Sequence, residues 1–258
     1  MKLGVSTLCL FKHPFEEVLK GIGKLDEVDV WEIVDEGLHK LDEKRVKQLT
    51  GLGKEYTVHA RFADINTATL RSDLREVFLK MLCKSLELSY KLNSKIWVLH
   101  AGVRSSLGYL FPEEEWRNNV GFLKSLSKKA EELDMIIAVE NLIAEGLIKK
   151  ISDLRKLIEE VNSEYVKACI DVGHLNVLSK QDIVKQLKEV EDYIVSMHLH
   201  DNRGDFDAHL EIGSGNIKWS EIFKFLKETR YENYAIIETY GFREASRSFK
   251  IVKKLLRI

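Results

Sequence analysis

Short apolar, β-branched runs alternate with longer segments of helical periodicity along the whole chain of 258 residues. Several runs, such as Ile96–Leu99 and Ile136–Val139, are apolar throughout, which is typical of strands buried on both faces of a parallel sheet. The pattern predicts eight strands, at Lys2–Thr7, Val28–Val34, Tyr56–Ala60, Lys95–Ala101, Met135–Glu140, Tyr165–Asp171, Tyr193–His200 and Asn233–Thr239.

The segments between these strands carry apolar residues at the spacing of amphipathic helices. One example is the stripe formed by Leu74, Val77, Phe78, Met81 and Leu82, with charged residues on the other faces. Alternating strands and helices predict a parallel sheet with right-handed crossovers. No linker divides the chain, and its length is close to the roughly 250 residues of a closed barrel. We therefore expect residues 1–258 to form a single α/β domain, a (β/α)8 barrel.

The positive and negative charges of the chain are almost balanced, so the overall charge favours neither nucleic acid nor a membrane surface as a partner. Lysine and arginine number 40 against 41 acidic residues, so there is no electrostatic signal for nucleic acid or an anionic membrane. No apolar stretch approaches the ~20 residues that span a bilayer, and no signal-peptide pattern is present. Cys9, Cys83 and Cys169 are scattered singly, as expected of free thiols. We expect a cytoplasmic protein without membrane association or an obligate protein partner.

Six consecutive predicted strands end in a side chain that can bind a metal ion. In (β/α)8 barrels the active site lies at the C-terminal ends of the strands and in the loops that follow them. Aspartate and glutamate number 41 and histidine 8 among 258 residues, so one or two such positions would be expected by chance. The six residues are His59, His100, Glu140, Asp171, His198 and Glu238.

Three further candidate ligands lie in the loops after the sixth and seventh strands. His174 follows Asp171 by three residues, and Asp207 and His209 form an Asp-x-His pair. Imidazole and carboxylate ligands without thiolate suit zinc, manganese or iron. Nine candidates are too many for one ion. The sequence therefore predicts two or three metal ions, most simply Zn²⁺ with Mn²⁺ as an alternative, bridged by a carboxylate.

Other residues near the predicted rim have more than one interpretation. Glu32 ends the second strand and could assist the metal site or form an ion pair. His200 shares a face with His198, and a structural role is favoured for it. His13 and His39 are expected on the surface. Candidate substrate-binding residues are Glu32 and four arginines that follow predicted strands, although ordinary surface positions are equally compatible with the arginines: Arg61, Arg104, Arg203 and Arg243.

The ordered set of motifs resembles the xylose isomerase-like barrel superfamily, and within it most closely the endonuclease IV type of abasic-site nuclease. The motifs are VHA (Val58–Ala60), VLHAG (Val98–Gly102), VEN (Val139–Asn141), IDVGH (Ile170–His174), HLHD (His198–Asp201), DAHLEIGSG (Asp207–Gly215) and IIET (Ile236–Thr239).

The resemblance to endonuclease IV implies three zinc sites. His59 and His100 would share Glu140 with a second ion, which Asp171, His198 and Glu238 would also hold. The third ion would be bound by His174, Asp207 and His209. The implied activity is hydrolysis of a phosphodiester in abasic DNA, or of another phosphoester, by metal-bound hydroxide.

A second enzyme class fits the same resemblance. Sugar isomerases and epimerases of the superfamily use a single metal held by the equivalents of Glu140, Asp171, His198 and Glu238, and the two glutamates exchange protons with the substrate. A one-metal enzyme does not need His59, His100, Asp207 or His209, so these residues favour phosphodiester chemistry. In a third hypothesis the metals only stabilise the barrel.

The chain also departs from the nuclease pattern. Arg61-Phe62 stands where Pro-Tyr is usual, the loop Cys9–His13 lacks the glycine-rich sequence, and the rim loops are short. These departures allow a small phosphorylated or sugar substrate in place of DNA.

Overall fold

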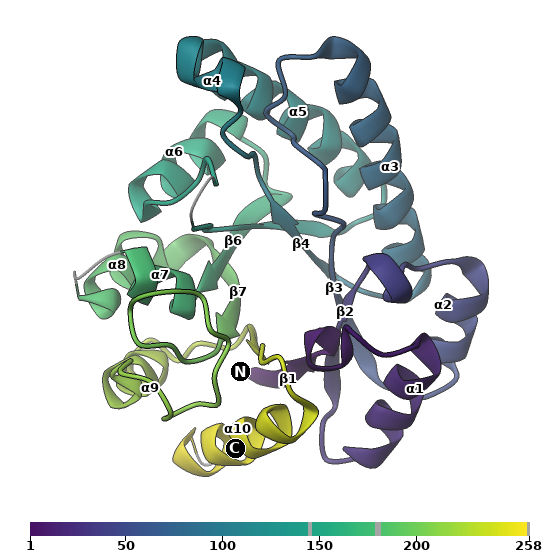
Figure 1. Ribbon diagram of the computed structural model, residues 1–258, viewed down its shortest axis with the longest axis vertical. Helices are drawn as coiled ribbons and strands as arrows, with labels where there is room; N and C mark the ends of the chain where they lie inside the picture. The colour runs from purple at the N-terminus through teal and green to yellow at the C-terminus, as the bar shows by residue number, and fades with distance from the viewer. Residues whose placement is uncertain (144–145, 179–181, 257–258) are drawn as a thin grey trace.

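The computed structural model describes residues 1–143, 146–178 and 182–256. It contains eight parallel strands closed into one barrel in the order β1 to β8 (Figure 1). The predicted (β/α)8 architecture is confirmed, and each strand agrees with its predicted bounds to within two residues. The strands are β1 (Lys2–Ser6), β2 (Val30–Val34), β3 (Glu55–His59), β4 (Ile96–His100), β5 (Ile136–Glu140), β6 (Val166–Asp171), β7 (Ile194–Leu199) and β8 (Tyr234–Ile237).

The helices surround this barrel on its outside (Figure 1). None of the helices among the described residues is long and apolar enough to cross a membrane. Their bounds are η1 (Thr7–Leu10), α1 (Phe15–Lys24), η2 (Gly37–His39), α2 (Glu43–Thr50), α3 (Ser72–Lys91), α4 (Ser106–Leu110), α5 (Pro112–Glu132), α6 (Ile151–Val161), α7 (Val172–Leu178), α8 (Ile183–Glu189), η3 (Glu191–Tyr193), α9 (Trp219–Glu228) and α10 (Phe242–Leu256).

A small apolar cluster of Ile96, Val98, Ala138 and Cys169 is separate from the larger core that includes helix residues. Because alternate residues of a strand point to the same face, the next residues on this face are His100, Glu140 and Asp171, at the C-terminal ends of β4, β5 and β6. This register directs polar side chains into the C-terminal mouth of the barrel.

Two expectations about burial differ from the structure. In the predicted stripe of α3, Leu82 is buried, whereas Leu74, Val77 and Met81 are exposed. At 1.5 Å per residue a 20-residue helix is about 30 Å long, far longer than a five-residue strand of about 17 Å, so the barrel cannot cover all of α3. The surface position predicted for His39 is wrong: the residue is fully buried, and its ring packs edge-on against that of Phe11.

Candidate metal centre

Ten His, Asp and Glu side chains meet at the C-terminal mouth of the barrel in three groups. Within each group one ligand atom per residue lies within 4.8 Å of the others. The structure brings together all nine ligands predicted from the sequence and adds His200. The groups are His59, His100 and Glu140; Glu140, Asp171, His198 and Glu238; and His174, His200, Asp207 and His209.

The first group joins the ends of β3, β4 and β5. Nε2 of His59 lies 3.3 Å and Nε2 of His100 lies 3.1 Å from Oε2 of Glu140. Nδ1 of His59 donates to the backbone carbonyl of Ala60 at 2.9 Å. A carbonyl oxygen can only accept, so Nε2 of the neutral ring is the nitrogen left to bind a metal. Hydrogen bonds of this kind commonly orient metal-binding histidines.

The second group is the most deeply buried, and His198 lies at its centre. Nδ1 of His198 is 3.4 Å from a carboxylate oxygen of Glu140, 3.4 Å from one of Glu238 and 3.8 Å from one of Asp171. Glu140 therefore faces the first group with Oε2 and the second with Oε1. This position is the one that a bridging carboxylate requires.

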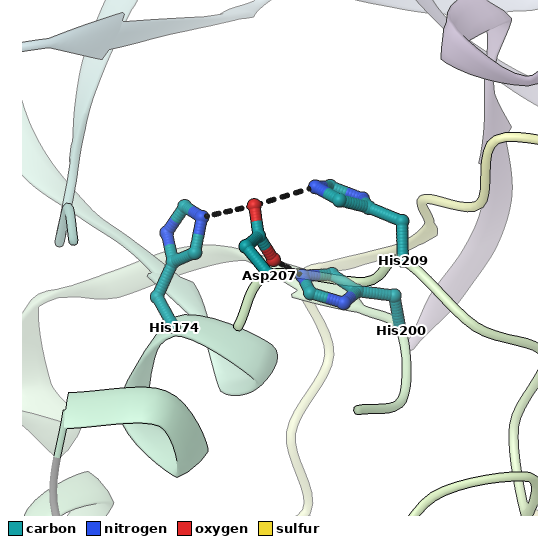
Figure 2. A group of neighbouring side chains, drawn as sticks. All are labelled: His174, His200, Asp207 and His209. Atoms are coloured by element: carbon teal, nitrogen blue, oxygen red, sulfur yellow. Dashed lines mark hydrogen bonds and ion pairs between the residues drawn. The ribbon is translucent and has the colours of Figure 1, made fainter. Parts of the chain in front are cut away.

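The third group combines the loop after β7 with α7 (Figure 2). Oδ2 of Asp207 lies 2.9 Å from Nε2 of His209 and 3.3 Å from Nε2 of His174. Nε2 of His200 is 3.5 Å from Oδ1 of Asp207. His209 has a φ of 43°, in the left-handed region that non-glycine residues seldom adopt, and such backbone conformations concentrate at functional sites.

Electrostatics couples the histidines to the carboxylates. Burial opposes the charge of Glu140, but His198 and His100 outweigh it and hold the pKa of this carboxyl well below its usual range. Burial also opposes a charged His174, yet Asp171 and the hydrogen bond to Asp207 raise the pKa of this ring to about 10. In the metal-free protein, protonated histidines thus offset the negative charge of the carboxylates. A metal ion that binds these ligands would displace the protons.

The donor set fits a divalent metal ion. Nδ1 of His198 is buried and has no hydrogen-bond partner among the described residues, although carboxylate oxygens surround it. A buried polar atom without a partner costs free energy, and a cation bound between this nitrogen and the carboxylates would remove that cost. The ligands are imidazole nitrogens and carboxylate oxygens, which suit zinc or manganese.

A pocket of about 180 Å³ opens above the metal-ligand groups. Its lining includes Glu140 and Glu238, the aromatic residues Phe62 and Tyr240, and four of the histidines, His59, His100, His174 and His209. The ring of Tyr240 lies 4.5 Å from that of His209. No lysine or arginine belongs to the described lining of this pocket.

The four candidate arginines lie elsewhere. Nε of Arg61 is 3.2 Å from the buried carboxylate of Asp35, and Arg104 pairs with the buried Glu115 at 3.1 Å. Both guanidinium groups therefore have a structural partner. Arg203 and Arg243 are exposed. A role for any of the four in substrate binding stays a prediction.

Glu32 lies beneath the second group. One of its oxygens is 3.1 Å from Nε2 of His198, on the side of the ring opposite the metal-ligand carboxylates, and the other accepts a hydrogen bond from Thr57. Both Glu32 and His198 are fully buried. Glu32 is thus an ion-pair neighbour of the His198 ring, although neither this oxygen of Glu32 nor Nε2 of His198 makes a hydrogen bond among the described residues.

Replacing Glu32 with glutamine is expected to weaken metal binding by roughly 10- to 100-fold, as is usual when the partner of a metal-binding histidine is lost. Competition with a chelator of known affinity measures the effect. Glu55→Gln is the matched control, because Glu55 lies at the opposite end of the barrel with Lys2. Equal metal affinity in Glu32→Gln and the control would contradict this role.

Comparison with known proteins places this geometry in a family. Residues 23–256 match the model of the xylose isomerase-like TIM barrel family. The chain belongs to this family. An uncharacterized protein of Methanocaldococcus jannaschii is 31% identical over 100% of this chain and 90% of its own length. A crystal structure of a D-tagatose 3-epimerase-like protein superposes with a TM-score of 0.92 at 31% identity, covering 100% of this chain and 97% of the other. A probable endonuclease 4 of Mycoplasmopsis synoviae is 26% identical over 57% of this chain and 56% of its own.

The relatives of this chain thus include both enzyme classes considered for the sequence. His200 is the member of the site for which the sequence predicts no metal ligation. Strand alternation places it on the same face as His198. It also lies seven residues before Asp207 in the same segment, and this closeness in sequence is the signal that could have linked it to the third group.

Proposed function

We propose that the protein is a metal-dependent isomerase or epimerase that acts on a small sugar. The observation that carries this proposal is the placement of Glu140 and Glu238 in one small pocket. The two carboxylates come from the ends of β5 and β8, three strands apart around the barrel, and each lies 3.4 Å from the same nitrogen of His198. Two carboxylates at one substrate carbon are what stereochemical inversion by proton transfer needs.

The reaction follows from these two residues. One carboxylate takes the proton from the carbon next to the substrate carbonyl, and the electron pair of the broken C–H bond delocalises to give an enediolate. The other carboxyl group, which starts protonated, donates its own proton to the opposite face of the same carbon. The product is the epimer, and the protonation states of the two glutamates are exchanged. A divalent ion bound by Glu140, Asp171, His198 and Glu238 would supply Lewis acidity to polarise the carbonyl.

The pocket supports a small, uncharged substrate. Its volume, about 180 Å³, lies below the roughly 300–1,000 Å³ of sites for drug-sized ligands, so only a small substrate fits inside it. Phe62 and Tyr240 offer aromatic surfaces to the apolar face of a sugar ring, and the described lining contains no cationic side chain. A DNA backbone would call for such side chains at the mouth.

The comparisons support the isomerase hypothesis better than the nuclease hypothesis that the sequence favoured. The solved structure at 31% identity, covering 100% of this chain, is D-tagatose 3-epimerase-like. The match to a probable endonuclease 4 has lower identity, 26%, and covers 57% of the chain.

Solvent exchange tests the proposed reaction on many sugars with one readout. Incubation of the metal-loaded protein with a panel of ketohexoses and ketopentoses in D2O is expected to place deuterium at the carbon next to the carbonyl, as detected by NMR. Glu238→Gln should abolish the exchange, whereas Glu211→Gln, a change just outside the pocket, should not. Absence of exchange with every sugar, in a protein shown to contain metal, would sink the proposal.

Phosphoester hydrolysis is a second candidate because His59 and His100 provide a metal-ligand group that one-metal epimerases do not need. Two ions on either side of Glu140 could serve a displacement at phosphorus. Cleavage of duplex DNA with a single abasic site, or release of nitrophenolate from bis(p-nitrophenyl) phosphate, would support this function. Neither reaction is expected if the protein is an epimerase.

A further inference from the structure

A surface groove continues from the pocket above the metal-ligand groups. The groove measures about 460 Å³ and is larger than this inner pocket of about 180 Å³, with which it shares the side chains of His209 and Tyr240. One wall is the loop after β7, and the other is the start of α10 with Tyr240 and Gly241 before it. We propose that the groove is a second sugar subsite, so that the substrate is a ketose that carries a glycosyl group.

Tyr240 lies where the inner pocket and the groove meet. Its side chain lines both, and it is 58% exposed, so much of the ring is accessible to a ligand. The ring of His209, 4.5 Å away, supports it from the protein side. An aromatic ring with a polar hydroxyl group offers an apolar surface and a hydrogen-bonding tip. A ketose that fills the inner pocket would thus leave an attached ring beside Tyr240, in the groove.

The charged side chains of the groove suit a neutral polyol. Nε of Arg247 is 2.6 Å from Oε2 of Glu211, and Nη2 is 3.1 Å from Oε1 of Glu244. Nη1 has no partner among the described residues and is available to donate to a ligand. His209 apart, the lining contains two carboxylates and one guanidinium group, so a phosphate or carboxylate on the substrate would be repelled. Sugar hydroxyl groups both donate and accept and can therefore use both kinds of side chain.

The groove is preformed because its two walls are fastened to each other and to the barrel. The backbone N–H of Ile212, in the loop, donates at 3.0 Å to Oγ of Ser248, which is buried on α10. Leu210 and Asp201 exchange two backbone hydrogen bonds at the base of the loop, and a carboxylate oxygen of Asp201 accepts from the N–H of Gly213 at 2.9 Å. A preorganised site loses little entropy when a ligand binds.

This subsite rests on the proposed function, since the sugar in the inner pocket is the one that reacts. A monosaccharide ends inside the inner pocket and does not reach Arg247. Binding energy from a part of the substrate that lies away from the reacting carbon can increase kcat/KM. A ketose with a glycosyl group should therefore be a better substrate than the same ketose alone.

Simple and glycosylated ketoses are compared in D2O with the metal-loaded protein. The probes are fructose, fructose 6-phosphate and the fructose disaccharides isomaltulose, maltulose and lactulose, which are unsubstituted at both carbons next to the carbonyl. We expect kcat/KM for deuterium incorporation to be higher for at least one disaccharide than for fructose by roughly 10-fold, or about 1.4 kcal/mol. If no disaccharide exceeded fructose, or if fructose 6-phosphate were the best substrate, the subsite would be overturned.

Two variants locate the effect in the groove. Ser214→Trp fills it, because Ser214 is an exposed residue of its lining, and Arg247→Leu removes the guanidinium group. Each should lower the ratio of kcat/KM for the preferred disaccharide to that for fructose by roughly 10-fold, whereas a general structural defect would lower both values alike. The matched controls are Ser125→Trp on α5 and Lys250→Leu on α10, which are exposed and outside both cavities. An unchanged ratio in both groove variants would refute the subsite.

Binding measurements separate failure of the subsite from failure of the proposed reaction. Isothermal titration calorimetry gives the Kd of fructose and of each disaccharide. If a disaccharide bound more tightly than fructose in the wild type but not in Arg247→Leu, and no sugar exchanged deuterium, the reaction would be refuted and the subsite supported. If fructose exchanged deuterium but no glycosyl group improved either kcat/KM or Kd, the subsite alone would be refuted.

Discussion

The Glu140→Gln variant is expected to have a kcat roughly 10³-fold lower than that of the wild type, within the 10²- to 10⁴-fold range of general acid–base catalysis. It should also bind fewer metal ions per chain. Glu140 is the residue shared by the first two metal-ligand groups, and its two oxygens face different groups. The amide keeps the shape of the side chain but offers no negative charge to a metal ion and no site for the transferred proton. Steady-state kinetics and elemental analysis of the same preparation measure both effects.

The control for Glu140→Gln must also remove a buried carboxylate. Glu115→Gln meets this condition, because Glu115 is fully buried and binds Arg104 and Ser105 away from the metal-ligand groups. This variant is expected to lose stability while keeping its metal and its kcat. Normal turnover in Glu140→Gln, or equal metal loss in the two variants, would show that Glu140 is not the bridging residue.

The sequence is sufficient to predict the barrel because its signals are local. A strand buried on both faces needs a continuous apolar run, and Ile96–Leu99 is one that no amphipathic surface element would contain. Strand ends then follow from the first polar residue, which is why His100 and Glu140 can be located correctly at the rim. The side-chain period of two also fixes their direction.

Residues whose roles depend on distant partners cannot be predicted in this way. Arg61 follows β3 like a rim residue, but its partner Asp35 lies after β2, and the pair is buried. His39 looks isolated in the sequence because Phe11, which covers it, is 28 residues away along the chain. For His200 the sequence favours a structural role, and its position beside Asp207 depends on how the loop carrying Asp207 folds back, which no local periodicity specifies.

Metal removal should make the stability of the protein depend on pH in the neutral to alkaline range. Burial disfavours charge on His209, but its hydrogen bond to Asp207 and the charge of Glu238 raise its pKa to about 9, and that of His174 is raised to about 10. Both values exceed the 6.5 of an unfolded chain. The stability that each histidine contributes is therefore fully present below pH 6.5. It is lost as the pH rises through the pKa of that histidine in the folded protein.

The size of this effect is roughly 3 to 5 kcal/mol for either histidine alone at 1.36 kcal/mol per pKa unit, but the two share Asp207 and do not add. Asp207 and Glu140, whose pKa values lie below their usual range, stay ionised throughout this window and change nothing in it. The unfolding temperature of the chelator-treated protein should therefore decrease as the pH is raised from 6.5 to 10. Differential scanning calorimetry measures this temperature.

The metal-loaded protein should behave differently because a metal ion replaces the protons. Binding to the folded state alone raises stability by about 4 kcal/mol at a ligand concentration 1,000 times Kd, and ligand deprotonation strengthens binding as the pH rises. The difference between loaded and metal-free protein should therefore grow from pH 6.5 to pH 9. The double variant His174→Gln/His209→Gln should lose much of this pH dependence in the metal-free state, because either histidine alone still pairs with Asp207. If the unfolding temperature of the metal-free wild type did not change between pH 6.5 and pH 10, the histidines would not be held protonated by the carboxylates as this geometry requires.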